Sequence, residues 1–137
     1  RAQSASLTEE EIKEFIMDEF TNSIIGCAIE VHKQLGPGLL ESSYEHCLIH
    51  ELSLQGIVCL NQVTLPIYYK GINIDAGYRL DLLFPGELIV ELKSVDRISP
   101  VHTAQLLTYL KLTGIKRGLI INFNVKKLID GIKRVSL

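Results

Sequence analysis

The chain has 137 residues, of which 47% are hydrophobic and 22% charged, and its net charge is -2 at pH 7. These values predict one soluble globular domain, and they exclude a disordered chain and a polycation that binds phosphate backbones over its whole surface. No run of about 18 apolar residues is present, so we expect no membrane span. Three cysteines, Cys27, Cys47 and Cys59, fit neither a disulfide framework nor a zinc knuckle. With no secretion signal in these residues, we expect a cytoplasmic protein.

The N-terminal part is predicted to be helical. Thr8 and Glu11 form a capping-box pattern at the head of a helix that we expect to lie outside the main body, so residues 1–20 are interpreted as a helical extension. Apolar residues recur at helical spacing over Thr21–Leu35. A second helix follows and ends before Gly56, which occupies the position of a left-handed cap.

Beyond the helices, the apolar period changes to two, which predicts strands joined by tight turns. Four strands are expected, namely Val58–Leu65, a segment of Pro66–Tyr69 continuing into Ile72–Ile74, Tyr78–Phe84 and Leu88–Lys93. Ser99-Pro100 predicts the start of a helix that ends at Gly114. The remaining elements are a buried strand Arg117–Phe123, a short helix near Lys126–Asp130 and a strand Ile132–Val135. This order predicts an α/β fold in which residues 21–137 form one domain.

Polar side chains interrupt an otherwise apolar hairpin around Pro85-Gly86. Strict alternation puts Leu80, Leu82 and Phe84 on one face of its first strand and Asp81 on the other.

The loop length sets the register of this hairpin. A three-residue loop places Asp81 directly opposite Glu91, with their Cβ atoms about 5 Å apart. Two carboxylates at that separation repel unless a cation or proton lies between them, which favours a divalent metal, with Lys93 supplying part of the countercharge. Mg²⁺ or Mn²⁺ suits a site that has carboxylates but no His or Cys ligand. The alternative is a solvated sheet face with a cross-strand Glu–Lys pair worth at most about 1 kcal/mol.

Two motifs support a family resemblance. Asp81, nine intervening residues and then Glu91-Leu92-Lys93 resemble the core motif of the PD-(D/E)XK nuclease superfamily, although the proline before Asp81 is absent. Gly38, Glu41 and Tyr44 form G-x-x-E-x-x-Y, and the chain from about residue 24 onward resembles the bacterial GxxExxY protein family.

The resemblance implies a restriction-endonuclease-like core, a mixed β-sheet flanked by α-helices. It implies metal ligation by Asp81 and Glu91, with the Leu92 carbonyl and Glu41 as further ligands. Lys93 would lie beside the attacking water. Gln105 and Tyr109 match a Q-x-x-x-Y pattern that some exonuclease-like members carry on the helix after this lysine.

Several of these residues have a second interpretation. Glu41 also fits an acid that interacts with a helix N-terminus, and Tyr44 fits a core aromatic. His102 lies on the same helix stripe as Gln105 and is a secondary candidate. Other secondary candidates are Glu30, His32 and a basic cluster of Lys126, Lys127, Lys133 and Arg134.

These patterns predict a Mg²⁺- or Mn²⁺-dependent nuclease that hydrolyses phosphodiester bonds, with DNA favoured over RNA. The alternative from another class is a catalytically inactive scaffold or nucleic-acid-binding module with the same fold. Because the net charge is -2, we expect a homodimer or a partner protein to help hold nucleic acid.

Overall fold

The computed structural model describes residues 6–137. It contains three α-helices: α1 (Glu9–Leu35), α2 (Glu41–Leu54) and α3 (Pro100–Thr113). The strands are β1 (Leu60–Thr64), β2 (Ile67–Tyr69), β3 (Ile72–Ile74), β4 (Arg79–Phe84), β5 (Leu88–Lys93), β6 (Arg117–Asn122) and β7 (Ile132–Ser136), with a 3₁₀ helix η1 (Leu128–Gly131) before the last. None of the helices in this part of the chain is long and apolar enough to cross a membrane.

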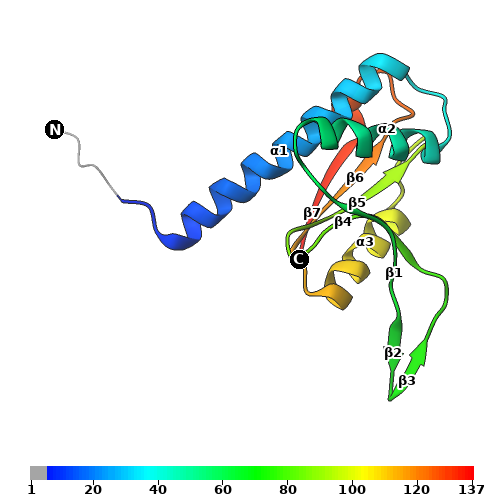
Figure 1. Ribbon diagram of the computed structural model, residues 1–137. Coiled ribbons are helices and arrows are strands. Elements are labelled where there is room, and N and C mark those ends of the chain that lie inside the picture. The colour runs from blue at the N-terminus through cyan, green and yellow to red at the C-terminus, as the bar shows by residue number, and fades with distance from the viewer. Residues whose placement is uncertain (1–5) are drawn as a thin grey trace.

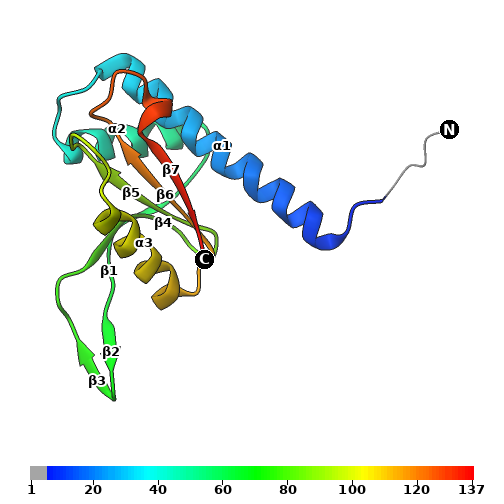
Figure 2. The same cartoon turned by 180° about the vertical axis from the view of Figure 1, so that it is seen from behind.

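The main sheet is mixed and lies between two helical layers. Its strand order is β1-β4-β5-β6-β7, in which β5 and β6 are parallel and every other neighbouring pair is antiparallel. Helices α1 and α2 cover one face of the sheet and α3 covers the other (Figures 1 and 2). Each face has its own apolar cluster. The predicted fold class, a mixed sheet flanked by helices, is confirmed.

Helix α1 is longer than the sequence patterns suggested. The predicted capping box forms, because the Thr8 side chain accepts from the backbone of Glu11 and the Glu11 carboxylate accepts from the backbone of Thr8. The helix then runs without interruption through residue 20, so the predicted helix start and the Thr21–Leu35 run belong to one element. Its buried residues begin only at Thr21, and its first turns extend beyond the sheet (Figure 1). Residues 1–5 of the predicted extension lie outside the described residues.

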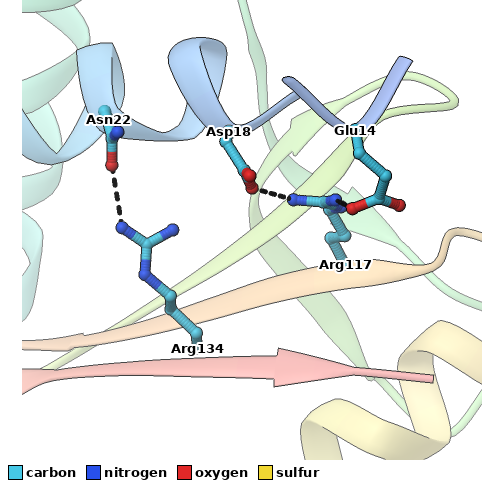
Figure 3. Close-up of polar contacts among 5 residues, drawn as sticks. All are labelled: Glu14, Asp18, Asn22, Arg117 and Arg134. Carbon is cyan, nitrogen blue, oxygen red and sulfur yellow. Dashed lines mark hydrogen bonds and ion pairs between the residues drawn. The ribbon is translucent and has the colours of Figure 1, made fainter. Parts of the chain in front are cut away.

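Polar contacts join residues 14–22 of α1 to the last two strands of the sheet, β6 and β7. The Arg117 guanidinium on β6 binds both Glu14 and Asp18, and the interactions raise the pKa of this arginine (Figure 3). One turn further along the helix, Arg134 on β7 donates to the side-chain amide oxygen Oδ1 of Asn22 over 2.8 Å. These contacts hold the helix against the sheet, together with the buried residues of α1 that begin at Thr21.

The segment counted as the second strand consists of two strands, β2 and β3, of a separate hairpin, and the hairpin tip expected at Lys70-Gly71 is confirmed. Strands β2 and β3 pair only with each other, and they project from the body as an arm (Figures 1 and 2). Lys70 and Gly71 at its tip both have positive φ, +47° and +85°. Two successive positive φ values are typical of the two-residue turn whose twist matches that of the flanking strands. The chain therefore reverses at Lys70-Gly71 and does not continue as one strand.

The remaining boundaries match the sequence patterns to within about two residues. Ser99 caps α3 and Pro100 is its first residue, as predicted. Gly114 ends this helix at φ +76°, a left-handed conformation that costs glycine little. Helix α3 therefore begins and ends at the predicted positions, over the face of the sheet that carries Ile89 and Ile120.

Candidate active site at the β4–β5 hairpin

The β4–β5 hairpin has the predicted register. Phe84 pairs with Leu88 and Leu82 with Val90, so the loop contains the three residues 85–87. Continued by one residue, this register puts Asp81 opposite Glu91. The two acids expected to converge are therefore neighbours on adjacent central strands.

The two carboxylates bond to the opposing backbones at this point. The Asp81 backbone N–H donates to Glu91 Oε2 over 2.9 Å, and the Leu92 backbone N–H donates to Asp81 Oδ2 over 2.8 Å. The residue pairing of the β4–β5 ladder stops at Leu82 and Val90. These reciprocal bonds hold both side chains in fixed orientations, as pre-organised ligands require.

The simple alternation expected for β4 is wrong at this position. Leu82 and Phe84 pack in the cluster under α1 and α2, whereas Leu80 packs in the cluster under α3. On the other side of β4, the register of β1 places Gln62 opposite Asp81, and Gln62 has a left-handed φ of +52°. The regular pairing is interrupted on both sides of Asp81, and the strand changes face there.

Glu91 is a buried acid with a strongly raised pKa. Its residue is 5% exposed, and burial together with the charges of Asp81 and Glu41 raises its pKa to about 8, against the opposing effects of the Asp81 backbone hydrogen bond and the Lys93 ammonium. A carboxyl group with this pKa is largely protonated at pH 7 when no cation is bound. The burial excludes the alternative of a solvated sheet face.

Lys93 ends β5 two residues beyond Glu91, so the two side chains leave the strand on the same face. It is half-buried, and within residues 6–137 it forms no ion pair. Its charge acts on Glu91 without a direct contact, leaving the ammonium group available to a further ligand.

Glu41 is the first residue of α2 and is exposed to solvent. Its charge raises the pKa of Glu91, which places it in the surroundings of the acid pair. Tyr44, one turn later, has the structural role given as its second interpretation. Its hydroxyl donates to the Gly36 carbonyl, its ring stacks on Phe123 at 4.3 Å between centroids, and it is fully buried.

Helix α3 brings one of its two predicted residues close to the acids. Tyr109 is buried, and burial first, then the charges of Glu91 and Asp81, raise its pKa to about 12. Gln105, one turn earlier, is half-buried. His102 instead completes the cap of the helix, because its Nδ1 accepts the Ser99 backbone N–H over 3.0 Å.

Two residues near the site were missed by the sequence analysis. Gln62 donates through Nε2 to Glu45 Oε1 over 2.7 Å and is 3.3 Å from Asp81 Oδ1. Glu45 is 7% exposed and therefore needs such donors. One sequence signal was present: Glu45 lies three residues before Leu48 and seven before Leu52, so it is an acid on the buried stripe of α2. Gln62 has no comparable signal.

The comparison with protein families agrees with this geometry. The family model described as the PD-(D/E)XK nuclease superfamily matches residues 18–135. This chain belongs to the PD-(D/E)XK nuclease superfamily. No curated protein and no solved structure gives a significant match. Membership indicates a nuclease-type function and a nucleic-acid substrate. PD-(D/E)XK nucleases are generally dependent on a divalent metal.

The donor set of this PD-(D/E)XK protein suits a hard cation. No three His, Cys, Asp or Glu side chains in residues 6–137 lie close enough together to hold a metal ion among themselves. Asp81 and Glu91 form a pair of carboxylates, and Mg²⁺ is commonly bound by one or two carboxylates, with water and phosphate oxygens completing its shell. The high pKa of Glu91 shows a buried acid whose charged form a cation would stabilise.

The remaining secondary candidates lie elsewhere in this superfamily member. His32 Nε2 bonds to the Val125 carbonyl over 2.8 Å, and Glu30 accepts from Gln34 on its own helix. Lys133 and Arg134 lie on β7, which β6 separates from β5. They are therefore not adjacent to Lys93.

Proposed function

We propose that this protein is a Mg²⁺- or Mn²⁺-dependent nuclease that hydrolyses phosphodiester bonds in nucleic acid, with DNA favoured over RNA. The observation that supports this most is the pair of reciprocal bonds between the Asp81 and Glu91 carboxylates and the opposing backbone N–H groups. These bonds fix two acids at an interruption in the central sheet, with Lys93 two residues further along the same strand.

Each residue has a chemical role in this proposal. When bound, the divalent cation neutralises the non-bridging oxygens of the phosphodiester and makes a water molecule more acidic. Asp81 and Glu91 would hold it through carboxylate oxygens, and the Leu92 carbonyl would be a further ligand. The Lys93 ammonium orients the attacking water and stabilises negative charge that develops on the phosphate.

The residues on the flanking helices have supporting roles. Glu41 would bind the cation through water, since it is exposed at the start of α2 and its charge acts on Glu91. Tyr109 lies near both acids and Gln105 lies one turn before it, so both face the substrate from α3. We also assign the chain to the GxxExxY group, on the motif Gly38, Glu41 and Tyr44.

Binding of nucleic acid requires positive charge that this chain does not supply in excess. Its net charge is -2, and Glu41, Asp81 and Glu91 make the surroundings of the site acidic. We propose that a second copy of the chain or a partner protein supplies part of the positive surface.

The test is a cleavage assay with labelled single-stranded and double-stranded DNA and matching RNA, in the presence of Mn²⁺. We expect the wild type to cut DNA, EDTA to stop cleavage, and Lys93→Ala to remove activity while the melting temperature is unchanged. The matched control is Lys13→Ala, because Lys13 is exposed on the part of α1 that precedes its buried residues.

If the wild type and Lys93→Ala are equally inactive and Mn²⁺ titration gives no binding heat, the nuclease proposal is wrong. The protein would then be an inactive scaffold or binding module with a nuclease fold.

A further inference from the structure

A small cavity opens between α3 and the residues that lead into and out of the β2–β3 arm. Its volume is about 200 Å³. It is lined by Leu65, Ile67, Tyr78, Gln105, Thr108, Tyr109 and Leu112. None of these side chains is charged, so the cavity suits a neutral group and not a phosphate or a metal ion.

Two aromatic rings and one amide give this cavity its chemistry. The Tyr78 and Tyr109 rings meet edge to face, with their centroids 6.4 Å apart. Tyr78 is 39% exposed, so part of its ring is open to a ligand. Gln105 supplies a carbonyl oxygen and an amide group, which make no hydrogen bond within residues 6–137. Apolar and aromatic walls with a few polar groups are typical of a site that binds a small organic group, such as a planar heterocycle.

The cavity is adjacent to the acid pair. Tyr109 lines it and packs in one apolar cluster with Leu80 and Ile89, which lie beside Asp81 on β4 and two residues before Glu91 on β5. Tyr78 precedes Asp81 by three residues, which corresponds to about 10 Å of extended chain.

We infer that this cavity binds an unpaired nucleobase of the substrate, next to the phosphodiester held at the acid pair. This inference rests on the proposed function and specifies the substrate class of the same site. The base stacks on the Tyr78 ring, and Gln105 donates to or accepts from its edge. Stacking on an aromatic side chain tolerates every base, because every base has a π face.

A base bound in this cavity restricts the form of the substrate. A base inside an intact duplex is stacked on both sides and paired along its edge, so it enters such a cavity only after unpairing, which costs a few kcal/mol. The preferred substrate is therefore a single strand, an overhang or a frayed end.

The experiment measures binding without cleavage, with the Lys93→Ala variant, Mn²⁺ and a fluorescein-labelled 12-nucleotide single-stranded DNA. We expect this strand to bind at least tenfold more tightly than a blunt duplex of the same sequence. A single abasic position moved along the strand should weaken binding about tenfold at one place, where the base enters the cavity.

Two substitutions added to Lys93→Ala test the cavity itself. Thr108→Trp fills it from its exposed edge, and Tyr78→Leu removes the open aromatic face. Both should bind the intact strand about tenfold more weakly and lose sensitivity to the abasic position. The matched control is Val101→Trp, on the same helix, 73% exposed and outside the cavity, and it should bind like the parent.

The inference is overturned if no abasic position matters, or if Thr108→Trp and Tyr78→Leu keep the parent's melting temperature and its affinity for the intact strand. Cleavage of DNA by the wild type alongside either result would leave the proposed nuclease intact and reject the base site alone. Absence of both cleavage and binding would reject the proposed function together with the base site.

Discussion

Replacement of Glu91 by glutamine is expected to change how stability depends on pH. Glutamine keeps the shape of the side chain and an oxygen that accepts the Asp81 backbone N–H, but it has no proton to lose. In the wild type, the pKa of Glu91 is about 8 in the folded protein, against an ordinary value of 4.5. Between these two values the folded state keeps a proton that the unfolded state has released. The free energy of unfolding therefore falls as pH rises through this window.

The magnitude follows from the size of the shift. With 4.5 for the unfolded chain and about 8 for the folded one, this carboxyl group alone lowers the free energy of unfolding by about 4 kcal/mol between pH 5 and pH 9. Below pH 4.5 the group is protonated in both states and has no effect. Above pH 8 it is charged in both, and the loss reaches its limit.

Urea unfolding at pH 5, 7 and 9 without divalent metal measures this effect. Between pH 5 and pH 9, Glu91→Gln should lose about 4 kcal/mol less stability than the wild type. The control is Glu87→Gln, since Glu87 is exposed in the turn of the same hairpin and should follow the wild type. Equal pH slopes for the wild type and Glu91→Gln would contradict the burial argument.

Addition of Mn²⁺ tests whether the Glu91 carboxylate itself binds the metal. At pH 8 and a concentration 100 times its Kd, the metal should raise the free energy of unfolding of the wild type by about 2.7 kcal/mol. It should have little effect on Glu91→Gln, which lacks one of the two carboxylates. An equal increase in both proteins would show that the metal binds elsewhere.

Three further substitutions test the support of the site and the fold. Gln62→Ala removes the amide between α2 and Asp81. It should weaken Mn²⁺ binding about tenfold, measured by calorimetry, because a hydrogen bond to a metal ligand is lost. An unchanged Kd would contradict this role of Gln62. Tyr44→Phe removes a buried hydroxyl that bonds two backbone groups and should cost about 1–3 kcal/mol in urea unfolding; no loss would contradict its structural role. Gly131→Ala would push a methyl group onto a backbone carbonyl oxygen of β6 and should lower stability by more than 2 kcal/mol. Gly26→Ala, in open space on α1, is its control and should raise stability by about 0.5–1 kcal/mol, and similar results for the two would contradict the packing argument.

The convergence of Asp81 and Glu91 could be predicted because it depends on local signals. Pro85-Gly86 predicted a turn, and a loop of three residues determines which side chains face each other. The bounds of α3 were equally local, since they follow from Ser99-Pro100 and Gly114. In each case, residues adjacent in sequence decide the geometry.

The course of α1 and the arm could not be predicted in the same way. The apolar pattern of α1 starts late because its first turns extend beyond the sheet, and Phe15 there remains 62% exposed. A pattern that reports burial therefore missed the continuity of the helix. In the arm, the successive residues Tyr68 and Tyr69 are both exposed, so the sequence shows no alternation of apolar and polar residues. The pattern therefore did not show that the two strands of the arm pair only with each other.

The contacts of Gln62 depend on three elements that are distant in sequence. Its amide reaches Glu45 on α2 and Asp81 on β4, 17 and 19 residues away. Its left-handed φ of +52° is uncommon for a residue other than glycine, asparagine or aspartate. Nothing in the residues beside Gln62 predicts that conformation.

The interruption of the sheet and the proposed chemistry have a common structural cause. In an unbroken antiparallel ladder, backbone carbonyl groups accept from the backbone N–H groups of the opposite strand. Those N–H groups then do not hold any side chain in place. Here the carboxylates of Asp81 and Glu91 accept from two of those N–H groups, over 2.9 and 2.8 Å. The regular β4–β5 pairing ends at Leu82 and Val90, so the two acids lie directly beyond the last pair of this hairpin. Two like charges are held side by side there, an arrangement stable at neutral pH only with a proton or a cation between them.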